Sequence, residues 1–403
     1  MIGLSTHTNS CNDNIISSLV HSDIKELKEV IDHKDKYEVQ IRYTQIDRDK
    51  NGMPSFRTFE YNVDDKKYFY PASTVKMPVA FLALQYLREK QKEGYMIDMM
   101  SPLRFGANRP IQSEMAIDTF GADGPPTTAK FIEEIFAISD NNAFNRLYEL
   151  LGPSYINNEL RRKGIFESSR IVHRVGVSGY TFEENMYLNP LAILGKNALI
   201  LPARKDSITL RNDMKGLKKG RAYYDKDEKL VNKHFDFSLK NIFTIRDLEA
   251  CIRRILFPES YHVYERFDLR PDDYKYLYST MMKVPKEIPY LAHDSTYYDG
   301  FVKFFYNGQN KEAIPHNIKI LNKIGCAYGT LTDCSYIFDI NSGAEFLLTA
   351  TVNVNTDGIY NDDKYEYAEI GYPFLAALGQ EVLKYEQHRI RNYKADFSKF
   401  LQR

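Results

Sequence analysis

The sequence has no tryptophan, only four cysteines and no net charge. The last two features limit the classes of protein to which the chain can belong. The cysteines (Cys11, Cys251, Cys326 and Cys334) show neither a disulfide framework nor a metal-ligand spacing, so we interpret them as free thiols, although the last two could meet across a hairpin. Lys and Arg number 54 against 54 Asp and Glu, which argues against a nucleic-acid partner. No apolar run is long enough for a transmembrane span. We expect a soluble globular chain of one large or two ordinary domains.

The first fourteen residues are polar and too short for a complete signal peptide. Within them, Ser10-Cys11-Asn12-Asp13 resembles the start of a mature bacterial lipoprotein. Two interpretations stay open for residues 1–14. They are either the remnant of an incomplete signal, with a lipid anchor at Cys11 and a periplasmic or cell-envelope location, or a flexible cytosolic terminus.

Hydrophobic periodicity predicts strands at both ends of the chain and helices between them. The predicted strands cover residues 37–46, 55–63, 318–324, 335–340 and 345–354. The predicted helices cover residues 15–33, 79–88, 129–138, 143–151, 154–164, 244–257, 272–283, 296–306 and 365–388. This order indicates an α+β fold, in which an antiparallel sheet formed by N- and C-terminal strands packs with a mainly helical middle region.

A charged segment interrupts this pattern at about residues 200–235. Between residues 204 and 233 it holds ten Lys or Arg against five acidic residues, which predicts an exposed insertion, such as an extended hairpin. Its positive charge would suit an anionic partner such as a cell-envelope polymer, but a charged run is more often only a solvated surface.

Ser73 and Lys76 lie three residues apart where the long apolar helix begins, so their side chains fall on one face. The helix N-terminus favours a developing oxyanion, and a partly desolvated amine can lose its proton near neutral pH. The spacing alone is weak evidence, because Ser22 and Lys25 repeat it and Ser73 could be a simple N-cap.

Two further motifs follow along the chain. Ser139-Asp140-Asn141 stands between two amphipathic helices, where it is either a helix cap or a set of side chains aimed into a cleft. Lys323-Ile324-Gly325 ends an apolar strand, where a glycine lets a substrate backbone come close and a lysine supplies positive charge.

Taken in order, these three motifs resemble those of the penicillin-recognising serine hydrolases, and most of all the class A β-lactamase family. The similarity extends over residues 139–164 and 243–256, so that it spans about residues 15–388. It implies a single catalytic domain over residues 15–403, interrupted by the charged insertion, and a monomer that needs no metal or cofactor.

The resemblance also implies roles for individual residues. Ser73 would be the acylated nucleophile, Lys76 its base or proton relay, and Ser139 the donor to the leaving nitrogen. The substrate-binding residues would be Asn141 for the side-chain amide, Lys323 with Gly325 for the carboxylate, and the backbone N–H groups of Ser73 and Cys326 for the oxyanion.

Two positions depart from the family pattern. Ile324 replaces a hydroxyl residue that would contact the substrate carboxylate, a loss of roughly 1–3 kcal/mol unless Thr330 or Thr332 substitutes. The family deacylates with the Glu of Glu-x-x-Leu-Asn, but here Asn185 stands four residues before Asn189. A one-residue bulge would let Glu184 serve as the base, with Asn189 helping to hold the water. Otherwise Glu184 is a solvated loop residue.

The sequence therefore predicts a serine hydrolase that opens a β-lactam through an ester on Ser73. The alternatives are a D-alanyl peptidase or esterase of the same fold acting on a cell-wall peptide, in which Lys76 serves both half-reactions, and a binding or scaffold protein without turnover.

Overall fold

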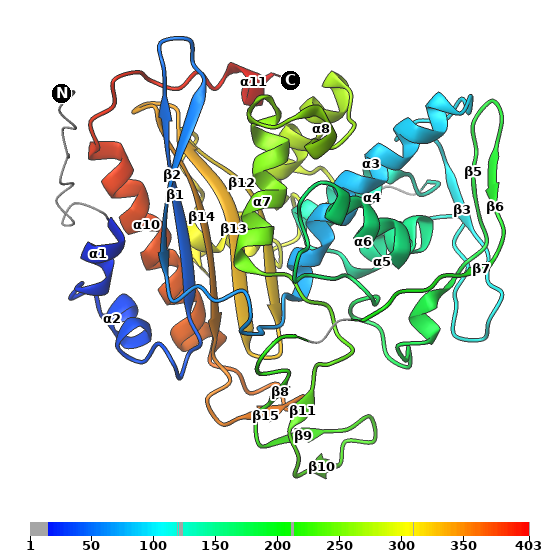
Figure 1. The fold of residues 1–403 in the computed structure, drawn as a ribbon, viewed down its shortest axis with the longest axis horizontal. Helices are drawn as coiled ribbons and strands as arrows, with labels where there is room; N and C mark the ends of the chain where they lie inside the picture. Colours follow the sequence, from blue (N-terminus) through cyan, green and yellow to red (C-terminus); the bar gives the residue numbers. More distant parts are fainter. Residues whose placement is uncertain (1–14, 119, 121–123, 211–212, 309, 403) are drawn as a thin grey trace, which may run out of the picture.

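A five-stranded antiparallel sheet stands between two layers of helices in the computed structural model, which describes residues 15–118, 120, 124–210, 213–308 and 310–402 (Figure 1). Its strands lie in the order β12-β13-β14-β1-β2. Their bounds are β1 Gln40–Arg48, β2 Pro54–Tyr61, β12 Ile318–Ala327, β13 Thr330–Asp339 and β14 Ala344–Asn353. The predicted α+β fold, with one sheet built from both ends of the chain, is confirmed.

The two ends of the chain meet in the middle of this sheet. Strand β1 pairs with β14 so that Tyr43 lies opposite Leu348, and the β1–β2 hairpin continues the sheet outward. Gly52, with φ 79°, makes the hairpin turn in a conformation that glycine adopts easily. The N-terminal hairpin therefore extends a sheet whose other three strands come from the last quarter of the chain.

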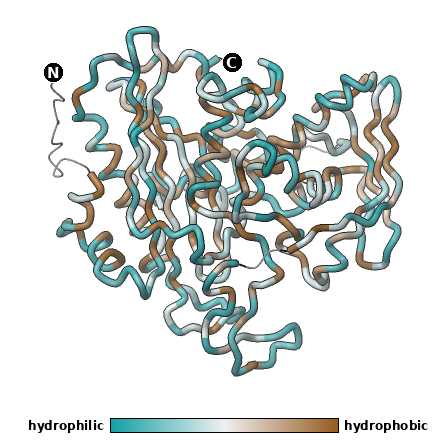
Figure 2. Tube along the Cα trace, viewed as in Figure 1, coloured by the Kyte–Doolittle hydropathy of each residue, from teal (hydrophilic) through white to brown (hydrophobic). Residues whose placement is uncertain are grey.

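One face of the sheet is covered mainly by helices from the two terminal regions, and the other by the middle of the chain together with the C-terminal helix α11 (Figure 1). The first layer holds α1 Ile15–Val20, α2 Lys25–Asp32, α9 Phe304–Asn307 and α10 Tyr372–His388. The second holds α3 Lys76–Lys92, α4 Thr128–Ala137, α5 Asn141–Leu151, α6 Pro153–Arg162, α7 Ile245–Leu256, α8 Pro271–Met282 and α11 Ser398–Leu401. Hydrophobic residues gather on the strands and on the inner sides of these helices (Figure 2).

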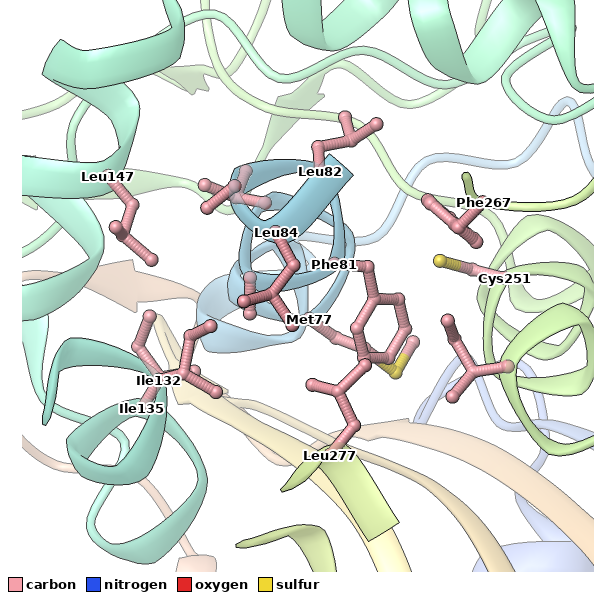
Figure 3. Packing of buried hydrophobic residues seen from close by; sticks show 14 of the residues in the cluster. Met77, Phe81, Leu82, Leu84, Ile132, Ile135, Leu147, Cys251, Phe267 and Leu277 are labelled. Carbon is pink, nitrogen blue, oxygen red and sulfur yellow. The ribbon is translucent and has the colours of Figure 1, made fainter. Parts of the chain in front are cut away.

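Helix α3 is the centre of the second layer. It is buried on nearly all sides over its first three turns, as expected for a helix that is apolar all round. In Figure 3 its side chains Met77, Phe81, Leu82 and Leu84 face residues of the surrounding elements. These neighbours are Ile132 and Ile135 of α4, Leu147 of α5, Cys251 of α7, Phe267, and Leu277 of α8. This packing fixes where α3 begins, and therefore where Lys76 lies.

The remaining strands are short and form small sheets away from the main one. β3 Leu103–Phe105 pairs with β5 Leu191–Ile193, which pairs with β6 Leu199–Leu201, and β4 Tyr187–Leu188 pairs with β7 Arg204–Lys205. Residues 218–236 of the charged segment form an antiparallel hairpin, in agreement with the prediction, because Lys218 pairs with Asp236 and Tyr224 with Leu230 in one continuous register. It contains β8 Lys218–Lys219, β9 Ala222–Tyr224, β10 Leu230–Val231 and β11 Phe235–Asp236, with β9 also pairing to β15 Ile359–Tyr360.

Several of the element boundaries predicted from the sequence are wrong. The predicted helix 15–33 is interrupted between α1 and α2, and the predicted helix 296–306 is a 3₁₀ turn, Asp299–Val302, followed by the four residues of α9. Residues 325–334, which lie between two of the predicted strands, are mostly strand, because β12 and β13 continue to a tight turn at residues 328 and 329. None of the helices in the described part of the chain is long and apolar enough to cross a membrane.

Gly379 provides a test of the packing between α9 and α10. A Cβ atom at this position would lie 1.8 Å from the carbonyl oxygen of Phe305, so Gly379→Ala forces the two helices apart. We expect a loss of about 1–3 kcal/mol in the free energy of unfolding, measured by urea denaturation. Gly124→Ala is the control, because a Cβ there meets nothing within 4 Å and should leave stability unchanged. Equal stability of the two variants would contradict this account of the contact.

Candidate active site

Ser73 lies on a 3₁₀ turn, Ala72–Val75, that leads directly into α3. The turn is held by Thr74, whose hydroxyl donates to the carbonyl of Pro71 at 2.7 Å. Ala72 has φ 46°, in the left-handed region, which turns the chain sharply just before Ser73. Ser73 is partly exposed, whereas Thr74, Val75 and Lys76 are buried. The chain therefore presents one hydroxyl to solvent from an otherwise buried segment.

Lys76 is fully buried, and its amine points at the second motif. Its Nζ donates to the Ser139 carbonyl, to Asn141 Oδ1 at 2.7 Å and to Ser139 Oγ at 3.4 Å. Burial lowers the pKa of Lys76 from 10.5 to about 7, and the charge of Asp140 only partly opposes this shift. Near neutral pH a large fraction of this amine is therefore uncharged and able to accept a proton.

Lys323 reaches the same hydroxyl from the sheet. Its Nζ donates to Ser139 Oγ at 2.7 Å and to the Ile324 carbonyl at 2.9 Å, and its side chain is buried. Burial, together with the nearby charge of Lys76, holds the pKa of Lys323 well below its usual value. Lys323 lies inside β12 rather than at the strand end, which corrects the predicted position. The lysines of the first and third motifs thus meet at Ser139.

The Ser139-Asp140-Asn141 segment both caps a helix and points side chains at the two amines. Asp140 is the N-cap of α5, because its carboxylate accepts from the Ala143 N–H at 2.7 Å. Ser139 has φ 60°, a conformation that costs a non-glycine residue about 1–3 kcal/mol and that is concentrated at functional sites. The two interpretations of this motif are therefore compatible.

Gly325 lets β12 lie directly against the Ser73 turn. A Cβ atom at residue 325 would lie 2.6 Å from the Pro71 carbonyl oxygen and 3.0 Å from Thr74 Cγ2, so any side chain would separate the strand from the turn. Cys326, the next residue, has a partly exposed free thiol, and the Tyr372 hydroxyl lies 3.9 Å from its Sγ. Cys326 lies opposite Leu331 and not Cys334, so the two cysteines do not face each other across the hairpin.

The hydroxyls of Thr330 and Thr332, the two suggested replacements for the one missing at Ile324, both have partners within the sheet. Thr332 is buried and bonded to Thr351 Oγ1 at 2.8 Å, and Thr330 Oγ1 accepts from Asn353 Nδ2 at 3.1 Å. Both hydroxyls form hydrogen bonds between strands of the sheet. The suggestion that one of them compensates for Ile324 therefore finds no support in the geometry.

Glu184 is engaged by Arg109 rather than by another of the predicted site residues. The Arg109 guanidinium donates to both carboxylate oxygens, at 2.9 and 2.6 Å, and these bonds hold the pKa of Glu184 below its usual range. Asn185 is buried, and its side chain bonds the backbone of Arg174 and Thr181. Asn189 is also buried and donates to the carbonyls of Gly106 and Ser113.

Two residues of this region were not found from the sequence. Arg109 gave no signal, since an isolated arginine in a polar loop has many possible partners. Gly176 is the other, because a Cβ there would lie 2.0 Å from Asn141 Nδ2. No local pattern connects Gly176 with Asn141, which lies 35 residues earlier in the chain.

The part of the chain that carries the first two motifs is similar to a known family. Residues 24–217 match the model of the beta-lactamase enzyme family. No curated protein matches the chain. A beta-lactamase from Sphaerobacter thermophilus is 16% identical, with 91% of this chain and 97% of that chain covered and a TM-score of 0.45. One from Desulfarculus baarsii is 13% identical, with 91% and 96% covered and a TM-score of 0.49.

A similar solved structure has a small molecule bound. It is a variant of the last common ancestor of Gram-negative bacteria beta-lactamase class A with 5(6)-nitrobenzotriazole, 15% identical, with 92% of this chain and 99% of that chain covered and a TM-score of 0.49. The family match over residues 24–217 confirms the resemblance that the motifs predicted. Over these residues the chain is similar to the β-lactamase enzyme family.

The buried amine of Lys76 predicts a pH-dependent stability. Because its pKa is about 7 in the folded protein and its ordinary value is 10.5, the unfolded chain binds this proton more tightly. Stability should therefore rise as the pH increases from about 7 to 10.5, while below pH 7 the full penalty is present. In Lys76→Met we expect this rise to shrink by an amount on the order of 5 kcal/mol.

Urea denaturation at a series of pH values measures this difference. Lys50→Met, a change at an exposed lysine, is the control and should follow the wild-type curve. Parallel curves for wild type and Lys76→Met would show that Lys76 keeps an ordinary pKa in the folded protein.

Proposed function

We propose that this chain is a serine hydrolase of the β-lactamase type, which opens a β-lactam ring through an ester on Ser73. The proposal is carried by one observation: the Ser139 hydroxyl is held between two buried amines, Lys76 and Lys323, beside the turn that presents Ser73. A β-lactam or a related small cell-wall acyl compound is the substrate class that this arrangement and the family match support.

The first half-reaction begins at Lys76. Its neutral amine takes the proton of the Ser73 hydroxyl, and Ser73 Oγ attacks the substrate carbonyl. The backbone N–H groups of Ser73 and Cys326 stabilise the oxyanion that forms. When the tetrahedral intermediate collapses, the carbon–nitrogen bond breaks and Ser139 passes a proton to the leaving nitrogen, a proton that Lys76 or Lys323 restores. Asn141 binds the amide of the substrate side chain.

The second half-reaction, hydrolysis of the ester, is less well supported by the residues of the site. Glu184 is bonded to Arg109 and therefore poorly placed to activate water, and Asn185 stands where the family has its glutamate. This observation favours a second candidate of the same fold, a D-alanyl peptidase or esterase in which Lys76 serves both half-reactions. A binding protein that is acylated but does not turn over is the limiting case.

We also propose a cell-envelope location, because members of the β-lactamase family are typically exported. Cys11, the residue predicted to bear a lipid anchor, lies outside the described residues. Labelling cells with a radioactive fatty acid, with Cys11→Ala as control, tests the anchor directly.

A fluorescent penicillin tests the proposed nucleophile. We expect the wild-type protein to gain the mass of one penicillin, as followed by intact mass spectrometry, and Ser73→Ala to gain none. Because Glu184 is poorly placed to activate water, we expect deacylation to be slow, so that the label persists for minutes or longer. A folded wild-type protein that is never labelled by the penicillin or by a cell-wall peptide ester would refute the serine-hydrolase proposal.

The pH dependence of acylation tests the role of Lys76. Since the neutral amine is the base, the acylation rate should rise with pH and reach half its maximum near pH 7, the pKa of Lys76. Stopped-flow measurement of labelling between pH 5 and 9 gives the profile. Lys76→Arg, which stays charged throughout this range, should lower the rate by about 100-fold or more. An unchanged profile in this variant would exclude Lys76 as the base.

A further inference from the structure

Two loops lie against each other on the Asn141 side of the site. The segment 106–116 and the segment 170–189 are joined by four sets of contacts between described residues. Asn189 donates to the Gly106 and Ser113 carbonyls, Gln112 donates to the Tyr187 carbonyl at 3.2 Å, the Tyr180 hydroxyl donates to the Ile111 carbonyl at 2.9 Å, and Arg109 pairs with Glu184. The first three sets end on a backbone carbonyl. The fourth is an ion pair between side chains.

The loop 170–189 also reaches the site itself. Gly176, with φ 62°, comes so close that a Cβ would lie 2.0 Å from Asn141 Nδ2. Asn145 holds the residue before it, accepting from the Val175 N–H at 2.9 Å and donating to the Val175 carbonyl at 3.0 Å. The other end of the Asn141 amide accepts from Lys76 Nζ at 2.7 Å. A shift of this loop therefore changes the place of Asn141 and its bond to Lys76.

Two contacts fix the orientation of Arg109 in its pair with Glu184. The guanidinium donates to both carboxylate oxygens, and its centre lies 3.9 Å from the centre of the Tyr187 ring. Bidentate pairing and stacking fix the orientation of an arginine more strongly than a single contact does. The side chains are 34% and 25% exposed, so dissolved salt can screen the pair.

We propose that Arg109 and Glu184 form a clasp that holds the loop 170–189 in place and thereby positions Asn141 for acylation. Glu184 is then a positioning residue, and its carboxylate takes no proton from water. The inference rests on the proposed function, because it concerns the rate of acylation at Ser73. It replaces the general-base role that the family pattern suggested for Glu184.

Exchanging the charges of Arg109 and Glu184 distinguishes a positioning role of Glu184 from a general-base role. Glu184→Gln and Arg109→Gln each break the clasp, and we expect the second-order acylation rate to fall about twofold to fivefold, as for a partly exposed ion pair of up to 1 kcal/mol. The fall should lie in the binding constant rather than in the limiting rate, and should shrink in 0.5 M salt. The double variant Arg109→Glu with Glu184→Arg remakes the pair in reverse and should recover at least half of the loss.

The matched control is Glu183→Gln. Glu183 is the neighbouring residue and pairs with Lys205, which lies outside the loop 106–116, so its loss should leave acylation unchanged. If Glu184→Gln leaves acylation intact but slows deacylation, and the exchanged pair is equally slow, Glu184 is the general base and the clasp proposal is wrong. The clasp proposal is also wrong if the exchanged pair restores none of the lost acylation rate.

Hydrogen exchange gives a readout that does not depend on catalysis. Breaking the clasp should speed amide exchange in residues 106–116 and 170–189, and the exchanged pair should slow it again. If the wild-type protein is never acylated but this exchange pattern is found, the proposed function fails while the clasp remains. If the loops exchange alike in wild type and Glu184→Gln, the clasp is overturned whatever the acylation rate.

Discussion

The hydroxyl of Ser139 is the point on which the site depends, because two buried lysine amines donate to it from different elements. Both amines lie in a region of low dielectric and close to each other, so both prefer to be uncharged. Folding must hold them there against that cost. The tight packing of α3 does so for Lys76, and the paired strands of the main sheet do so for Lys323. The packing of the core therefore offsets the free-energy cost of burying these two amines.

The parts of the site differ in how completely they are formed. The groups proposed for acylation lie on regular elements or beside a helix cap, as with Lys76 at the start of α3 and Asn141 at the start of α5, which Asp140 caps. The groups proposed for hydrolysis of the ester lie on a loop, and the carboxylate there already has a partner in Arg109. On the proposed function, the residues of the site therefore support formation of an ester on Ser73 better than its hydrolysis.

Much of the fold and of the site could be predicted from the sequence, for reasons that particular residues make clear. The apolar run after Lys76 and the alternation after Ile318 were strong enough to predict α3 and β12. The three motifs were found because each combines a chemical group with a helix start or a strand. The length of β13 was underestimated, because Thr330, Thr332 and Asp333 are polar yet buried, and their hydrogen bonds form only in the folded sheet. The contact of Gly176 with Asn141 joins residues 35 positions apart in different elements, and no local pattern encodes it.

The pairing of β1 with β14 has a consequence for how the chain acquires its structure. The hairpin made first during synthesis has no neighbour until residue 353 has emerged from the ribosome, so the sheet cannot close early. Contacts this distant along the chain make folding slow. Since Lys323 belongs to the same late strands, the turn that carries Ser73 is made long before the strand that brings Lys323 to Ser139. The three motifs therefore come together only after these strands have been made.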